Sequence, residues 1–253
     1  MKRIFTLSAI ILFAALNAFS QQYTGMSGLI HVPSADMDSA GDARIGVHFL
    51  NHEFTPNHPV WHYDGKKYDT GDMYLSLTPF KWISIGYTMT LFKRHADPQF
   101  PKDKDGYTAK DRYFSIKIRP LEEGKWWPSV AIGSNDCLTS KPFKSNDVSG
   151  GNGYWRNYYG ALTKHFSIKG NTIGVTAVYR HFISIYNHRW NGLVGGVTFR
   201  PAFARNLRAV VEWTGCDVNF GVDCLLWKHL LLQASLQDGR YPSGGICYVV
   251  NLF

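Results

Sequence analysis

The chain has 253 residues, a common size for one β-barrel or β-sandwich domain. Hydrophobic residues make up 45% and charged residues 18%, which excludes intrinsic disorder. An aromatic content of 15%, with 24 Gly and 11 Pro, favours many short strands and argues against an all-helical bundle. The formal net charge of +8 becomes +6 if the first two basic residues, Lys2 and Arg3, are removed with a leader.

The first 20 residues have the pattern of a secretory signal peptide. Two basic residues precede an apolar run over 9–16, and small residues lead to Ser20. We therefore predict a signal peptide over 1–20, cleaved near Ser20 and before Gln21. An anchoring helix would need about 20 apolar residues, and Asn17 interrupts this run too early. Because no later stretch is long and apolar enough for a spanning helix, a membrane form of this chain would have to be a closed barrel.

From residue 43 onward, apolar and polar residues alternate with period two, as in strands with two different faces. In the clearest example, Ile85, Tyr87 and Met89 share one face, and Ser84 and Thr88 share the other. Twelve such segments are predicted, at 43–51, 71–79, 82–92, 110–119, 128–135, 153–163, 171–181, 191–200, 206–213, 217–225, 228–237 and 244–253.

The connections between these segments fall into two classes. Tight connections alternate with longer or more polar ones at 52–70, 93–109, 136–152, 182–190 and 238–243. Outer-membrane barrels combine short periplasmic turns with longer outer loops, whereas a soluble sandwich has no reason for this asymmetry. The pattern predicts an all-β fold, an antiparallel transmembrane β-barrel of the outer-membrane type with about 12 strands over 43–253. Residues 21–42 form an N-terminal segment that lies in the periplasm or in the lumen.

Aromatic residues close to the predicted turns and loop mouths fit an interfacial girdle. These residues are Trp82, Trp127, Trp155, Trp190, Trp213, Trp227, Tyr113 and Tyr179. A soluble sandwich would instead bury them in its core, so their environment distinguishes the two architectures.

Six ionisable residues lie on the polar faces of predicted strands: Lys117, Arg119, Arg180, Arg200, Arg208 and Glu212. A charge on the lipid face at mid-depth costs about 2–4 kcal/mol, so we predict that all six line the lumen. There they either fill the interior with ion pairs or line a hydrophilic path. Arg208 and Glu212 lie four positions apart on one face, roughly 13 Å along the strand, which is too far to pair directly. We therefore expect Glu212 to compensate an arginine of a neighbouring strand, Arg200 or Arg180, because an unpaired buried carboxylate is costly.

Local motifs for catalysis or metal binding are absent from the sequence. No G-x-S-x-G motif occurs, and the four cysteines lack zinc-site spacing. We predict no catalytic residue, cofactor or metal and no enzymatic activity, although a lipid-modifying barrel enzyme needs no local motif and stays open. A disulfide between Cys137 and Cys216 also stays open. Basic and acidic residues alternate in the loops, which argues against nucleic-acid binding and favours contact with lipopolysaccharide or an acidic glycan.

Three stretches resemble the YjbH-like family of outer-membrane barrel proteins associated with exopolysaccharide biosynthesis and export. GLIHVPSADM at 28–37 is similar to an opening GLI-x-x-P-[ST]-A-x-M segment. Residues 114–133, with the turn LEEG at 121–124, resemble a hairpin of pattern K-x-R-L-L-x-E-G-x-x-x-P-A-[LV]-A-x-G, with Pro120 in place of a Leu. EWTGCDVNFG at 212–221 resembles a late E-[YW]-D-G-x-D-x-N-x-G hairpin, with Thr214 in place of Asp.

The resemblance implies a non-enzymatic barrel in the outer membrane of a Gram-negative bacterium that supports the assembly or export of an exopolysaccharide or surface polysaccharide. Its implied partners are outer-membrane lipid and lipopolysaccharide, an acidic polysaccharide and periplasmic export proteins. A general structural or small-solute barrel is the alternative.

Overall fold

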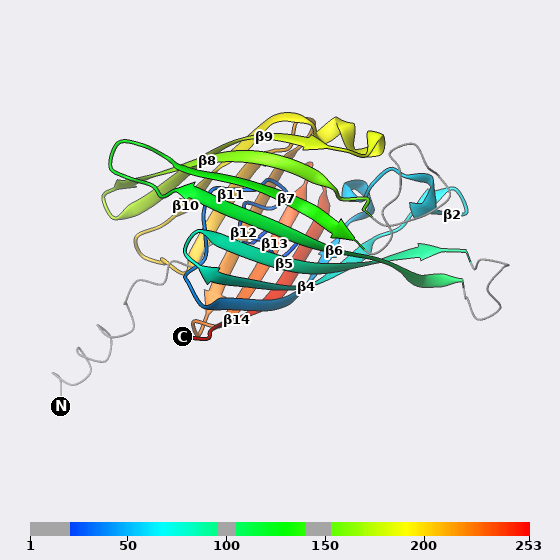
Figure 1. The fold of residues 1–253 in the computed structure, drawn as a ribbon, viewed down its shortest axis with the longest axis horizontal. Helices are drawn as coiled ribbons and strands as arrows, with labels where there is room; N and C mark the ends of the chain where they lie inside the picture. Colours follow the sequence, from blue (N-terminus) through cyan, green and yellow to red (C-terminus); the bar gives the residue numbers. More distant parts are fainter. Residues whose placement is uncertain (1–20, 96–104, 140–152) are drawn as a thin grey trace.

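Twelve antiparallel strands form a closed barrel, which confirms the predicted fold class and strand number (Figure 1). The computed structural model describes residues 21–95, 105–139 and 153–253. The predicted signal peptide lies outside these ranges. Each strand pairs with its sequence neighbour in the barrel, and β1 pairs with β14 to close it. The barrel strands are β1 (Asp42–Leu50), β4 (Thr70–Phe80), β5 (Ile83–Arg94), β6 (Gly106–Leu121), β7 (Ser129–Thr139), β8 (Asn157–Ile168), β9 (Asn171–Phe182), β10 (Gly192–Arg200), β11 (Leu207–Trp213), β12 (Val218–Leu226), β13 (Leu230–Gln237) and β14 (Tyr241–Asn251).

The two ends of the barrel differ. The C-terminus and the connections at 81–82, 122–128, 169–170, 201–206 and 227–229 lie at one end, called here the turn end (Figure 1). The other end, the loop end, carries β2 (His62–Tyr63), β3 (Lys66–Lys67) and the 3-10 helices η1 (His52–Phe54), η2 (Pro59–Trp61) and η3 (Ile185–Trp190). The connection predicted as a long loop at 238–243 is only three residues long, because Asp238 and Gly239 adopt positive φ and make a tight turn into β14.

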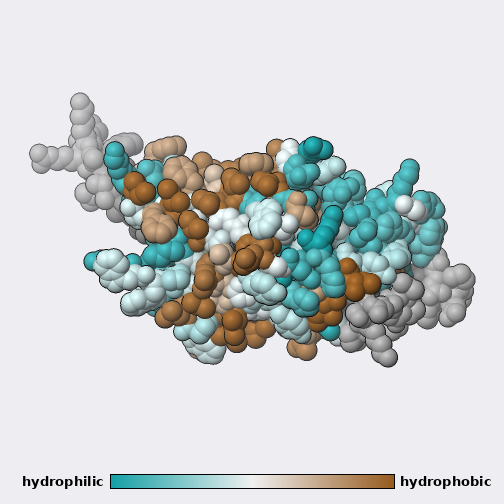
Figure 2. Space-filling model, turned by 90° about the horizontal axis from the view of Figure 1, so that it is seen from above, coloured by the Kyte–Doolittle hydropathy of each residue, from teal (hydrophilic) through white to brown (hydrophobic). Residues whose placement is uncertain are grey.

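Side chains alternate across the barrel wall. In β11, Val211 and Trp213 are 44% and 48% exposed on the outside, whereas Arg208 and Glu212 are buried inside. The same alternation places apolar side chains over the outer surface, while hydrophilic residues gather toward the loop end (Figure 2). Within the described ranges, no helix combines the length and apolar character needed to cross a membrane.

The predicted aromatic girdle is correct for five of its eight members. Trp82, Trp127, Trp213, Trp227 and Tyr179 are exposed on the outside. The other three, Trp155, Trp190 and Tyr113, are fully buried in an aromatic cluster at the loop end of the lumen, with Phe54 and Trp61. These three residues do lie close to loops, as predicted. The predicted outward orientation is wrong, because their side chains point into the barrel and cover the loop end of the lumen.

The N-terminal segment 21–41, called here the plug, lies inside the barrel (Figure 1). Residues 21–35 are all buried, and two isolated bridges, Gln21 with Ser27 and Gly28 with Pro33, fold the segment back on itself. Leu29, Ile30 and Val32 pack with lumenal side chains of β7 to β11. The lumen is therefore filled by the chain's own N-terminal segment.

Candidate functional site: the plug and its seat

The carboxylate of Glu212 binds three consecutive backbone N–H groups of the plug. Ile30 N and Val32 N donate to Oε2 at 2.9 and 3.0 Å, and His31 N donates to Oε1 at 2.8 Å. A tight turn, in which Leu29 N donates to Val32 O at 2.8 Å, points these groups the same way. Asn219 Nδ2 on β12 donates to Oε1 at 2.7 Å. Successive N–H groups form a small anion-binding concavity, so here the plug is the donor and the barrel wall supplies the anion.

Arg208 pairs with a carboxylate on the neighbouring strand β12. Its Nε donates to Asp223 Oδ2 at 2.9 Å, and the two residues are direct neighbours in the pairing of β11 with β12. The guanidinium also donates to Gly28 O at 3.3 Å and Leu29 O at 3.5 Å. Asp223 thus balances the charge of Arg208, whereas the plug's N–H groups occupy the Glu212 carboxylate, which interacts with Arg180 only at longer range.

Arg180 and Lys117 hold plug carbonyls from two other strands. Arg180 on β9 donates to His31 O at 3.0 Å, with further bonds to the carbonyls of Trp190 and Thr214 at 3.3 and 3.4 Å. Lys117 Nζ on β6 lies 2.6 Å from both Ser27 O and Ser27 Oγ, and 3.1 and 3.0 Å from the carbonyls of Ser34 and Asp36. Both cations are buried.

The two remaining predicted lumenal charges, Arg119 and Arg200, lie nearer the turn end. Arg119 donates to Lys81 O at 2.8 Å and lies 3.7 Å from Glu122, so it belongs to the rim of the barrel. Arg200 is partly buried at the end of β10 and interacts electrostatically with Arg208, Asp223 and Asp36. The structure therefore brings Lys117, Arg180, Arg208 and Glu212 together on the plug, and these four residues with their neighbours on the wall are called here the seat; Arg119 lies outside it.

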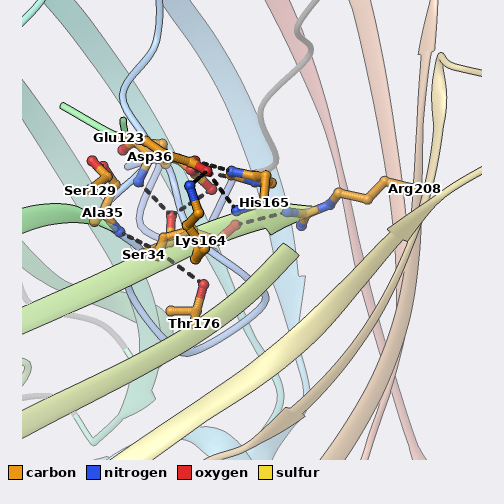
Figure 3. A network of polar contacts seen from close by, with 12 residues as sticks. Ser34, Ala35, Asp36, Glu123, Ser129, Lys164, His165, Thr176 and Arg208 are labelled. Carbon is orange, nitrogen blue, oxygen red and sulfur yellow. Dashed lines mark hydrogen bonds and ion pairs between the residues drawn. The ribbon is translucent and has the colours of Figure 1, made fainter. Parts of the chain in front are cut away.

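At the turn end, the 122–128 turn folds toward the plug (Figure 3). Glu123 accepts from His165 N at 2.9 Å, its Oε2 lies 2.7 Å from His165 Nδ1, and Lys164 Nζ lies 2.9 Å from Oε1. The other ring nitrogen of His165 faces Asp36 of the plug at 3.7 Å. Burial raises the pKa of Glu123, but the hydrogen bonds from His165 and Lys164 outweigh it, so the pKa falls below its usual value.

Neutral side chains complete the seat. Ala35 N donates to Thr163 Oγ1 at 2.9 Å, and Ser129 Oγ donates to Ala35 O at 3.1 Å. On β1, Arg44 forms a buried ion pair with Asp38 at the exit of the plug. Ala35 and Ser129 lie in the stretches that carry the family resemblance, whereas Thr163, Asp38 and Arg44 are not singled out by the sequence. Asp223 and Arg44 share the polar parity of their strands, so the alternation could have identified them as inward-facing, but it carries no signal for their partners.

Plug residues also enter the aromatic cluster at the loop end. The ring of His31 stacks with that of Tyr23 at 5.1 Å and lies 4.8 Å from Trp190. His31 Nδ1 faces Arg180 at 3.2 Å; because a guanidinium only donates, this nitrogen accepts. Burial lowers the pKa of His31 well below its usual value, and the positive charges of Arg180 and Arg189 lower it further. His31 is therefore neutral in the plugged state.

The wall opposite the main contacts carries buried polar groups that do not bond to the plug. His48 and Asp72 are direct neighbours across β1 and β4, both are buried, and among the described residues neither side chain hydrogen-bonds to the plug. Residues 27–36 make their polar contacts with strands from β6 to β11. The plug is thus bonded mainly to one side of the barrel.

The three stretches singled out by resemblance converge on this site. The first, 28–37, is the central part of the plug. The second supplies Lys117, Glu123 and Ser129, and the third supplies Glu212 and Asn219. Segments separated by about 80 to 180 positions therefore form one contact network.

The described residues contain no group of three or more His, Cys, Asp or Glu side chains that could hold a metal ion. All four cysteines are free thiols, so Cys137 and Cys216 are not bridged in this structure.

Comparison with known proteins gives one family. Residues 20–150, just over half of the chain, match the family described as "YjbH: Exopolysaccharide biosynthesis protein YbjH". No curated protein matches the chain. Among solved structures, the outer membrane phospholipase A from Escherichia coli matches with a TM-score of 0.38 and 12% identity, over 85% of this chain and 98% of that chain. The calcium-bound phospholipase dimer from Salmonella typhi matches with a TM-score of 0.36 and 10% identity, over 85% and 92%. The fold assignment rests on the strand pairing described above.

Proposed function

Because the chain belongs to the YjbH family of exopolysaccharide biosynthesis proteins, we propose that it is a non-enzymatic, plugged outer-membrane β-barrel that supports the assembly or export of an exopolysaccharide or surface polysaccharide. Family membership supports the process. The closed barrel with an apolar outer surface supports the membrane location.

The observation that carries the proposal is the use of the lumenal charges. Glu212, Arg180 and Lys117 direct their hydrogen bonds mainly at the backbone of the plug. A catalytic group must instead reach a substrate and the proton that it transfers. This use of the lumenal charges supports a structural or gating role over a catalytic one.

A deletion strain tests the proposed process. It is complemented with the wild-type gene, with Glu212→Gln, or with the matched control Glu122→Gln, whose side chain is exposed at the turn end. We expect deletion to reduce cell-surface polysaccharide, the wild type and the control to restore it, and Glu212→Gln to alter its amount. Unchanged polysaccharide together with altered permeability to small solutes would contradict the proposal and favour the small-solute barrel.

The location is tested separately. We expect the mature protein to start at Gln21 and to fractionate with the outer membrane, where lipid and lipopolysaccharide contact its outer surface. N-terminal sequencing of the membrane-extracted protein measures the cleavage site. Recovery of the mature protein from the soluble periplasm would contradict this location.

A further inference from the structure

Two buried cations in the seat lack a carboxylate partner. In the described ranges, the hydrogen bonds of Lys117 all end on neutral oxygens, and those of Arg180 end on carbonyls and on the ring nitrogen of His31. Lys117 is 0% exposed and Arg180 is 2% exposed. Charge-assisted bonds to anionic oxygens are about twice as strong as neutral ones, and a buried cation favours an anionic partner. Asp36 and Asp38 of the plug act on Lys117, and Glu212 acts on Arg180, only at longer range, so among the described residues neither cation has a direct ion pair.

The plug presents these cations with a row of oxygens. Carbonyl groups from Ser27 to Asp36 face Lys117, Arg180 and Arg208 from three strands of the same wall. The wall thus binds the plug through main-chain oxygens that are spaced along the segment. A polymer whose oxygens carry negative charge would fit the same groups and would neutralise Lys117 and Arg180.

Exposed cations surround the turn end of the barrel, and this rim is called here the turn-end mouth. Each of the five connections at the turn end carries one, and these residues are Lys81, Lys125, Lys169, Arg205 and Lys228. Arg119 and Lys164 contact residues of these connections at the rim, and Arg200 lies deeper, at the end of β10 near Arg208. Charges of one sign at an entrance raise the local concentration of ligands of opposite sign. The turn end also carries the carboxylates of Glu122, Glu123, Asp36 and Asp38, but the cations outnumber them from the rim to the seat.

Three further carboxylates lie in the loop-end half. Asp111 accepts from Gly153 N and Tyr154 N at 3.2 and 3.3 Å, and Asp136 accepts from Trp155 N at 3.2 Å. Asp72 lies in the same half, because the pairing of β4, β5 and β6 places it level with Asp111. The excess of cations at the turn-end mouth and the direct contacts of Lys117 and Arg180 therefore place a site for an anionic chain at the turn-end mouth and the seat.

We propose that the turn-end mouth and the seat of the plug bind a carboxylate-bearing polysaccharide, which displaces the plug's carbonyls from Lys117 and Arg180. This inference rests on the proposed function and names the substrate class of the same site. The plug is then a built-in competitor that occupies the seat until an acidic glycan replaces it.

Binding is measured with the purified full-length protein in detergent, with polygalacturonate as the acidic probe and dextran as the neutral polymer. We expect polygalacturonate to bind, dextran not to bind, and monomeric galacturonate to bind much more weakly because it engages one cation at a time. Added salt should weaken binding. Lys117→Gln with Arg180→Gln should lower the affinity by about tenfold or more. The exposed pair Lys125→Gln with Lys169→Gln, which leaves the seat intact, should mainly slow association.

Displacement of the plug is measured in a separate labelling experiment. The four native cysteines are replaced by Ala, and Ser34→Cys is introduced in the buried part of the plug. We expect polygalacturonate, but not dextran, to accelerate labelling of this thiol by a maleimide. This arm does not depend on the folding of the Lys117 and Arg180 variants.

Three results would overturn the inference: equal binding of dextran and polygalacturonate, polygalacturonate binding that does not change labelling at position 34, or equally tight binding by the folded seat variant. If Lys125→Gln with Lys169→Gln weakened binding to anionic phospholipid vesicles but left polygalacturonate binding unchanged, the exposed cations of the turn end would be a membrane contact, and the inference would also fail. The deletion strain separates these failures from that of the proposed function: lost surface polysaccharide together with charge-independent binding would contradict only the inference.

Discussion

Glu212 joins two parts of the chain that lie about 180 positions apart, and it does so through backbone groups. Replacing it by Gln removes the charge and turns an amide donor toward N–H groups that need an acceptor. Hydrogen bonds to a charged group contribute about 1.5–3 kcal/mol each, so we expect Glu212→Gln to weaken the plugged state by about 3 kcal/mol.

The measurement is the rate at which Ser34→Cys is labelled in the cysteine-free background. Glu212→Gln should raise this rate by about a hundredfold or more, since 1.4 kcal/mol corresponds to a factor of ten. Glu122→Gln, which changes the same chemical group on the exposed rim, is the control and should leave the rate unchanged. Equal rates in the two variants would show that Glu212 does not hold the plug.

His31 makes the plugged state sensitive to pH. Its pKa in the plugged state lies well below 6.5, because burial and the charges of Arg180 and Arg189 oppose protonation. When the plug leaves, the ring regains an ordinary pKa of about 6.5. The displaced state therefore binds the extra proton, and the stability of the plugged state falls as the pH drops below about 6.5.

We expect labelling of Ser34→Cys to accelerate between about pH 6.5 and pH 5 after correction for the pH dependence of the maleimide reaction itself. His31→Gln keeps a polar side chain of similar size that cannot titrate, so this variant should lose most of the acceleration at low pH. A pH profile that is identical in both proteins would contradict the assignment to His31.

The plug as an element depends on a glycine near its start. Gly25 has a φ of +85°, and a Cβ there would come within 2.6 Å of the Tyr74 ring on β4. Gly25→Ala thus combines backbone strain with a steric clash. We expect the variant to keep the barrel but to release the plug, which would appear as rapid labelling of Ser34→Cys with normal heat-modifiable gel mobility. Slow labelling would show that Tyr74 yields and the plug remains seated.

The strands and the plug differ in how far the sequence predicts them. Alternation identifies β11 and its inward residues Arg208 and Glu212, because a strand must give one face to the lumen and the other to the surroundings. It does not identify partners: Asp223 pairs with Arg208 only through the register of β11 with β12. The plug has no periodicity, and its contacts to Glu212 and Lys117 use backbone atoms that every residue has, so sequence alone left its location open.

At the scale of the whole molecule, closure depends on the pairing of β1 with β14, which runs from Asp42 with Asn251 to Phe49 with Gly244. A barrel that cannot close exposes two strand edges, which lipid cannot satisfy. Removal of residues 241–253 should therefore abolish the compact, heat-modifiable form on gels. Removal of residues 62–67, which contain only the small β2–β3 sheet at the loop end, is the control and should preserve it. Loss of the compact form in the control alone would contradict this account of closure.

The plugged lumen is the central claim, and the accessibility of one buried plug residue tests it most directly. In the otherwise wild-type cysteine-free protein, Ser34→Cys is labelled with a membrane-impermeant maleimide at neutral pH, before and after thermal unfolding. Because Ser34 is fully buried between the plug and the barrel wall, the account predicts little labelling of the folded barrel and complete labelling once it is unfolded. Rapid and complete labelling of the folded, heat-modifiable protein would contradict it.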